Sequence, residues 1–136
     1  MGKLHRITKM IDFCYGHRLL NYAGKCRYLH GHNGRIEVDI ESKELDQLGM
    51  VIDFGVVKDV VRTWVDNNLD HCMLLCKHDP YVPILQAQGE PLFLMDENPT
   101  AENIAKVIYQ QASRSGLKIT ELRLWETPSS FAAYRE

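Results

Sequence analysis

Three histidines within sixteen residues form the strongest chemical signal in this 136-residue chain. His30 and His32 stand two positions apart, and such residues in an extended segment point to the same side. Neutral imidazole is the commonest protein ligand for zinc, and Gly31 between the two lets the backbone bend so that both rings reach one ion. With His17 as the third ligand, the pattern indicates a zinc site with one open position, as in catalytic zinc centres.

Two alternatives stand beside this interpretation of the cluster. Single histidines are more often surface or packing residues, and the three could be no more than that. A structural zinc site built from Cys and His is the other alternative. It is disfavoured because the four cysteines contain no C-x-x-C pair; they are Cys14, Cys26, Cys72 and Cys76.

Cys26 is the candidate base. It lies four residues before His30 and between Lys25 and Arg27. A nearby divalent cation and two positive neighbours favour the thiolate, which could remove a proton at neutral pH. A small buried hydrophobic residue is an equally good interpretation of this cysteine.

Two further positions could carry acid–base or binding chemistry. Asp70 directly precedes His71, and a carboxylate beside an imidazole can fix its tautomer and raise its basicity; the alternative is a solvated helix end. Glu126 shares strand parity with Leu122 and Leu124, so it faces the core or a pocket if the strand continues that far. A carboxylate there needs hydrogen-bond donors, which the N–H pair of a pterin or guanine would supply; otherwise the strand ends earlier and Glu126 is solvated.

The elements that must position these residues follow from hydrophobic periodicity. The predicted strands are residues 4–13, 35–41, 92–95 and 118–126, and the predicted helices are residues 53–69 and 100–115. The parity of the first strand continues to His17. Asp53 and Thr100 are the expected N-caps, and Gly116 suits the end of the second helix. This order predicts an α+β fold with a mainly antiparallel sheet and both helices on one face.

Composition narrows the class of protein. The chain is 45% hydrophobic and 25% charged, which is typical of one globular domain spanning residues 1–136. A net charge of −2 does not suggest a nucleic-acid-binding face. We see no apolar run long enough to cross a membrane and no signal-peptide core, so we expect a cytoplasmic protein with reduced thiols.

At this point the motifs resemble those of the 6-pyruvoyltetrahydropterin and 6-carboxytetrahydropterin synthase family. The matching segments are residues 13–19, 26–33, 49–54, 69–71, 98–103 and 125–127, in order along essentially the whole chain. The resemblance implies a tunnelling fold (T-fold), with a four-stranded antiparallel sheet and two helices on one face. It also implies a homo-oligomer, often a hexamer built as a dimer of trimers, with the active site between subunits.

The resemblance assigns roles by position. It implies that His17, His30 and His32 bind Zn²⁺, that Cys26, Asp70 and His71 are catalytic, and that Glu126, Thr100 and Glu102 bind the pterin. One departure concerns the residues before the first histidine, where the family usually has small side chains and this chain has Cys14-Tyr15-Gly16. Tyr15 could therefore narrow or reshape the substrate pocket.

The resemblance further implies conversion of 7,8-dihydroneopterin triphosphate. The short spacing from Cys26 to His30 favours the branch that makes 6-carboxy-5,6,7,8-tetrahydropterin, with release of triphosphate and acetaldehyde, in queuosine synthesis. The alternatives are the 6-pyruvoyltetrahydropterin (biopterin) branch and a non-catalytic pterin-binding module. A branch that makes a folate precursor ranks lowest, because no glutamate lies between Lys25 and His32.

Overall fold

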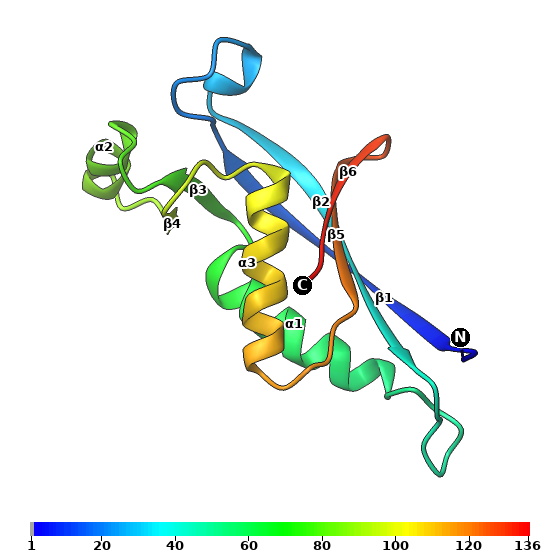
Figure 1. Cartoon of the computed structure of the whole chain (residues 1–136). Coiled ribbons are helices and arrows are strands. Elements are labelled where there is room, and N and C mark those ends of the chain that lie inside the picture. Colours follow the sequence, from blue (N-terminus) through cyan, green and yellow to red (C-terminus); the bar gives the residue numbers. More distant parts are fainter. Residues whose placement is uncertain (1) are drawn as a thin grey trace.

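The structure, a computed structural model, describes residues 2–136 and contains one six-stranded sheet in the order β4-β3-β1-β2-β5-β6. The strands are β1 (His5–His17), β2 (His30–Ser42), β3 (Cys72–Cys76), β4 (Leu92–Met95), β5 (Glu121–Thr127) and β6 (Ser130–Tyr134). The helices are α1 (Phe54–Asn68), α2 (Tyr81–Ala87) and α3 (Ala101–Arg114), with a short 3₁₀ turn, η1 (Lys25–Arg27). Figure 1 shows β1 and β2 as a long hairpin, with the short β3 and β4 beside one end of it.

The α+β prediction is confirmed, but the prediction of four strands is wrong, because the sheet has six. Two pairings, β1 with β3 and β3 with β4, are parallel, and the other three are antiparallel. The sequence of β3 is a continuous apolar run without alternation, which is why periodicity did not reveal it. The helix α2 has seven residues and lies between the two predicted helices, where we predicted only the strand 92–95.

The predicted helix ends agree with the structure. The Asp53 carboxylate accepts a hydrogen bond from the Gly55 N–H at 2.7 Å, and the Thr100 hydroxyl accepts one from the Asn103 N–H at 3.1 Å. Gly116 follows α3 with a φ of +100°, a conformation that favours glycine. Within residues 2–136, none of the helices has the length and apolar character that a membrane span requires.

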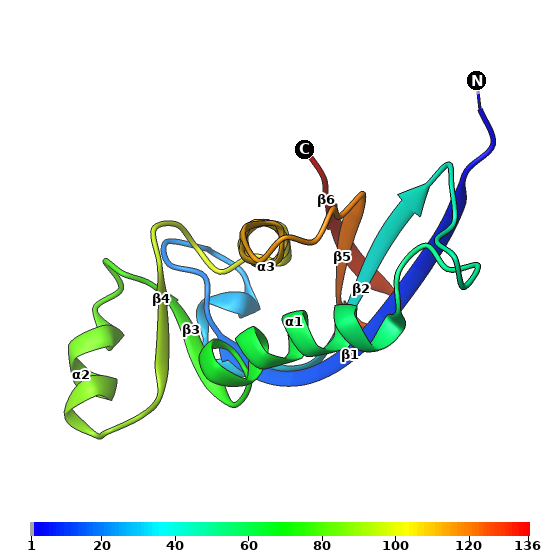
Figure 2. The same ribbon diagram turned by 90° about the horizontal axis from the view of Figure 1, so that it is seen from below.

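The hydrophobic core lies between one face of the sheet and the helices α1 and α3, which lie on the same side of it (Figure 2). Alternate residues of three strands point into this core. They are Ile11, Phe13 and Tyr15 from β1, Ile36, Val38 and Ile40 from β2, and Leu122 and Leu124 from β5. The helices contribute Val57, Val61 and Val65 from α1, and Ile104, Ile108 and Ala112 from α3. Because His17 continues the buried parity of β1, it lies at one end of the same core face.

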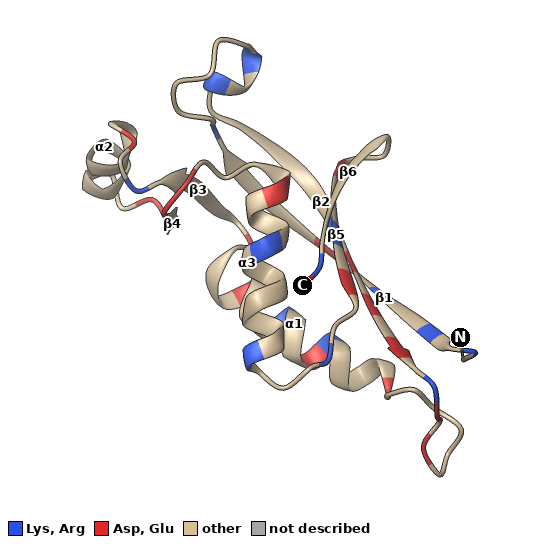
Figure 3. Cartoon of the chain, viewed as in Figure 1, with Lys and Arg blue, Asp and Glu red and all other residues tan. Residues whose placement is uncertain are grey.

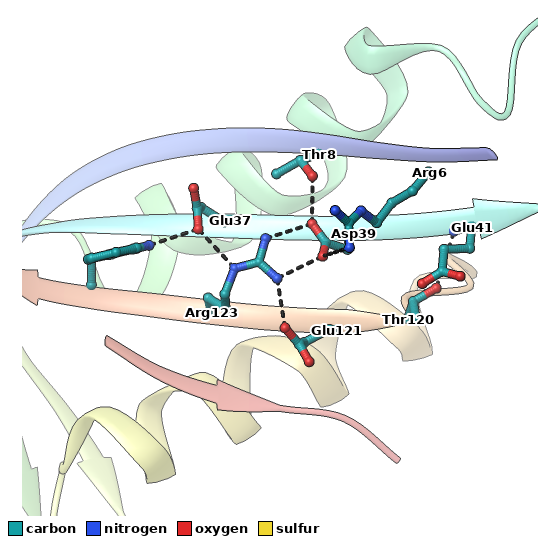
Figure 4. A network of polar contacts seen from close by, with 9 residues as sticks. Arg6, Thr8, Glu37, Asp39, Glu41, Thr120, Glu121 and Arg123 are labelled. Atoms are coloured by element: carbon teal, nitrogen blue, oxygen red, sulfur yellow. Dashed lines mark hydrogen bonds and ion pairs between the residues drawn. The ribbon is translucent and has the colours of Figure 1, made fainter. Parts of the chain in front are cut away.

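The opposite face of the sheet carries a polar network (Figure 4). The Arg123 guanidinium donates to Asp39 through two nitrogens, at 2.7 and 2.8 Å, and also to Glu37 and Glu121. Thr8 donates a further bond to Asp39 at 2.7 Å. Asp39 is therefore only 2% exposed, although strand alternation placed it on the polar side. Figure 3 shows acidic and basic residues intermingled along this part of the sheet.

Candidate metal centre and active site

The three histidines meet where β1 and β2 are paired at the end of their hairpin. His17 lies directly opposite His30, and Tyr15 lies directly opposite His32, so all four side chains project from the same face. One ligand atom from each histidine lies within 4.8 Å of the others. Gly31 takes an ordinary place in the strand ladder, opposite Gly16, so the cluster forms without a bend there.

Backbone carbonyls fix the tautomers of two of these rings. The Nδ1 atoms of His17 and His30 lie 2.6 Å from the Pro99 carbonyl and 2.7 Å from the Tyr28 carbonyl. Because a carbonyl can only accept, each Nδ1 carries the proton and each Nε2 has a free lone pair. Metal-binding histidines typically donate their other ring N–H to a carbonyl or carboxylate in this way.

Burial also favours the neutral form of His17 and His32. It lowers the pKa of His17 to about 4, with the charges of His30 and His32 acting in the same direction against the Pro99 hydrogen bond. Burial likewise lowers the pKa of His32. The Nε2 atoms of His17 and His32 are buried and have no hydrogen-bond partner, an arrangement that normally costs stability. Unsatisfied buried ring nitrogens are suited to a divalent ion such as zinc.

Glu126 lies beside this cluster, near the end of β5. Its Oε1 is 3.9 Å from the His17 Nε2, and its Oε2 is 3.9 Å from the His32 Nε2. The Tyr15 hydroxyl donates to Glu126 Oε1 at 3.4 Å. Burial of the ring is the main cause, and the nearby Glu126 carboxylate the second, of a Tyr15 pKa far above its usual value, so the phenol stays protonated. The parity of Tyr15 with His17 was the sequence signal for its place here, whereas no motif revealed the role of the Pro99 carbonyl.

Asp70 and His71 form a hydrogen-bonded pair. The Asp70 carboxylate lies 2.8 Å from the His71 Nδ1 and accepts a bond from the Cys14 N–H at 2.9 Å. Burial opposes ionisation of Asp70, but these hydrogen bonds outweigh it and lower the pKa of the carboxyl group. His71 has a φ of +59°, which is uncommon for a residue with a side chain, and such strain is often found at functional sites.

This pair lies on the other side of the sheet from the three histidines. The hollow that Asp70 and His71 line, about 730 Å³ in volume, is also lined by Asn33, Arg35 and Trp125, whose strand parity is opposite to that of His32. The His71 side chain is 78% exposed. The chain therefore presents two chemical groups on opposite faces of the sheet, and His71 also borders a hollow of about 540 Å³ whose lining includes His30 and His32.

The remaining candidates are Cys26, Thr100 and Glu102, of which Thr100 directly follows Pro99, whose carbonyl contacts His17. Cys26 is half-buried in η1, and its carbonyl accepts a hydrogen bond from the Leu19 N–H at 2.8 Å. Within residues 2–136, no cysteine sulfur belongs to the metal-binding group. The Thr100 hydroxyl caps α3, and Glu102 is exposed in the first turn of that helix.

Comparison with known proteins places these features in a family context. The family model described as 6-pyruvoyl tetrahydropterin synthase matches residues 6–136. A 6-carboxy-5,6,7,8-tetrahydropterin synthase of Rickettsia bellii is 38% identical over 133 residues, which cover 93% of this chain and 96% of that protein. A protein of the same name from Haemophilus influenzae is 32% identical over 141 residues, covering 98% of this chain and 100% of that one.

Solved structures show the same fold. An uncharacterized protein from Wolinella succinogenes superposes with a TM-score of 0.79 at 27% identity, covering 98% of both chains. The 6-pyruvoyl tetrahydropterin synthase of Caenorhabditis elegans superposes with a TM-score of 0.71 at 22% identity, covering 99% of this chain and 97% of that chain.

Proposed function

Because the chain belongs to the 6-pyruvoyl tetrahydropterin synthase family, we propose that it is a zinc-dependent 6-carboxy-5,6,7,8-tetrahydropterin synthase of the queuosine pathway. The observation that carries this proposal is the 38% identity, over nearly all of both chains, to a relative of that name. The substrate would be 7,8-dihydroneopterin triphosphate, and the other products would be triphosphate and acetaldehyde. The four cysteines of the chain are unpaired, as expected of a cytoplasmic protein.

His17, His30 and His32 would hold the zinc ion through ring nitrogens. When bound, zinc would act as a Lewis acid that polarises the side-chain hydroxyls of the substrate. The fit rests on the two buried Nε2 atoms that lack a hydrogen-bond partner and on the two Nδ1 protons held by carbonyls. These residues are arranged to present lone pairs, not protons, to a ligand.

Proton transfer would be carried out by Cys26 and His71. Cys26 lies in the loop that joins β1 to β2 and would remove a proton from the substrate side chain. Asp70 holds the Nδ1 proton of His71, so the His71 Nε2 is free to accept or return a proton. Glu126 would bind the N–H edge of the pterin ring, and Thr100 and Glu102 would lie near that pocket.

A complete site requires two copies of the chain. Within one copy, His71 and the three histidines lie on opposite faces of the sheet, and the site would be completed by the His71 of another copy facing the histidine cluster. The edge of β1 from His5 to Asp12 pairs with β2 alone, and β6 ends the sheet, so both offer free backbone groups for another copy. We propose a homo-oligomer, with a hexamer of two trimers as the expected form.

Subunit mixing tests the shared site. Chains carrying His32→Ala and chains carrying His71→Ala should each be inactive. If each site takes the histidine cluster from one chain and His71 from another, unfolding and refolding the two variants together restores part of the activity. If the mixture stays inactive although mixed oligomers form, the shared site is excluded.

Product analysis tests the reaction itself. Zinc-loaded protein is incubated with 7,8-dihydroneopterin triphosphate, and the products are identified by mass. A 6-carboxypterin species with acetaldehyde supports the proposal. A 6-pyruvoyl product moves the chain to the biopterin branch, and pterin binding without turnover identifies a non-catalytic module. Cys26→Ala serves as the matched variant, and full turnover by it would remove Cys26 from the mechanism.

A further inference from the structure

The Glu126 carboxylate lies close enough to the histidine cluster to compete for a bound metal. Zinc binds imidazole nitrogen at roughly 2.0–2.1 Å and carboxylate oxygen at roughly 2.0–2.2 Å, so two ligand atoms on one tetrahedral ion lie about 3.4 Å apart. The distances from Glu126 to the Nε2 atoms of His17 and His32, both 3.9 Å, exceed this spacing only slightly, so a small movement of the carboxylate would bring an oxygen onto the ion. A negatively charged oxygen there would occupy the open position that a catalytic zinc needs.

Tyr15 is placed to restrain this carboxylate. Its hydroxyl donates to Glu126 Oε1, the oxygen that faces His17. At 3.4 Å this bond is longer than the usual 2.5–3.0 Å. Tyr15 is 3% exposed, so no water competes freely for the hydroxyl.

The ring of Tyr15 occupies a space that the surrounding residues leave for it. It stacks on Phe13 with a centroid distance of 5.1 Å and meets His17 edge-on at 5.2 Å. Gly34 lies opposite Phe13, and a Cβ atom added there would come within 2.9 Å of the Tyr15 ring. A side chain at position 34 would therefore displace the Tyr15 ring. The ring packs between Phe13 and His17 in a space that Gly34 leaves open.

We propose that Tyr15 is a positioning residue that holds Glu126 away from the metal and so keeps the fourth coordination position open for substrate. This inference rests on the proposed zinc site. It predicts two opposite effects of losing the hydroxyl. Glu126 would join the ion, which strengthens metal binding, and would no longer be free for the pterin ring, which weakens pterin binding.

The test compares Tyr15→Phe with the wild type and with Tyr134→Phe. In the control, Tyr134 on β6 loses a hydroxyl that donates to the Glu136 carboxylate at 2.8 Å. Zinc release to excess chelator is timed, the absorption spectrum of the Co²⁺-substituted protein is recorded, and neopterin affinity is measured by fluorescence titration. Thermal melts establish that each variant is folded, and Tyr15→Phe combined with Glu126→Gln isolates the carboxylate.

In Tyr15→Phe we expect zinc release to slow about tenfold, which is within the range by which residues hydrogen-bonded to metal ligands change metal affinity. We also expect a changed Co²⁺ spectrum and weaker neopterin binding. In the double variant, zinc release should return to the rate of Glu126→Gln alone. Release and spectrum identical to those of the wild type in Tyr15→Phe would overturn the inference and leave the zinc site standing. A wild type that binds no zinc would overturn both.

Discussion

The two faces of the sheet treat buried polar groups in different ways. On one face, the half-buried Arg123 covers the buried Asp39, and a bidentate bond joins them. On the other face, the Nε2 atoms of His17 and His32 are buried without any partner. Buried polar groups are usually satisfied. The Arg123 network is satisfied within the protein, whereas the two histidine nitrogens have no protein partner and are available to a ligand.

This contrast separates stability from function. The network around Arg123 ties β2 to β5, and its members donate and accept among themselves (Figure 4). The histidines instead leave lone pairs unused, at a cost that a metal ion would offset. The comparison therefore predicts that changes on one face alter the free energy of unfolding, while changes on the other alter metal binding and turnover.

The largest effect is expected from His32→Ala. Loss of one of three ligands should reduce zinc affinity by more than about a hundredfold, beyond the effect of residues that only support a ligand, and should abolish turnover. His78→Ala is the control, because His78 is exposed and outside the cluster. Zinc competition with a chromophoric chelator measures the change. Wild-type affinity in His32→Ala would remove that histidine from the ligand set.

Arg123→Met should lower the free energy of unfolding and leave zinc binding unchanged. It leaves the Asp39 carboxylate, 3% exposed, without its main partner, and breaking a buried pair in this way typically costs about 3–5 kcal/mol. Denaturant unfolding measures this loss, and the variant should still bind zinc in the wild-type ratio. Arg35→Met breaks the exposed pair with Asp12 and should cost far less, because solvent screens exposed ion pairs. Equal costs for the two variants would contradict the account.

These two predictions show how much was accessible from the sequence. Alternation placed His17 on the core side of its strand and Glu126 on the side of Leu122 and Leu124. Alternation also put Asp39 on the polar side, but its burial depends on Arg123 from another strand, which no local pattern encodes.

The position of His71 on the far face could not be predicted for a similar reason. It follows from the parallel pairing of β3 with β1, and the Cys72–Cys76 sequence carries no periodic signal for that pairing. Long-range pairing, more than local propensity, separated the two halves of the proposed site.

The pH dependence of the unfolding free energy should also distinguish the two faces of the sheet. Burial alone would raise the pKa of Asp39, but Arg123 and Thr8 together lower it below its usual value. The unfolded chain then binds more protons, so the contribution of Asp39 is complete above about pH 3.9 and is lost as the pH falls through the folded pKa. The unfolding free energy of metal-free Asp39→Asn should fall less steeply below pH 4 than that of the wild type. An unchanged slope in Asp39→Asn would refute this point.

The smallest effect concerns Thr100, which the family resemblance placed near the pterin. Its hydroxyl caps α3, so Thr100→Ala should cost about 1 kcal/mol of unfolding free energy, and Thr100→Ser should restore most of it. Neopterin titration of both variants separates capping from binding. A large loss of pterin affinity in Thr100→Ser, with stability retained, would show that the threonine methyl group contacts the ligand.

The central claim is that His17, His30 and His32, without a cysteine, form the metal centre. X-ray absorption spectroscopy of the zinc-loaded protein tests it most directly, because zinc binds sulfur at roughly 2.3 Å and nitrogen or oxygen at roughly 2.0–2.2 Å. The account predicts a shell of nitrogen and oxygen only, with the scattering pattern of three imidazoles. A sulfur atom in that shell would contradict it, and would make Cys26 a ligand instead of a base.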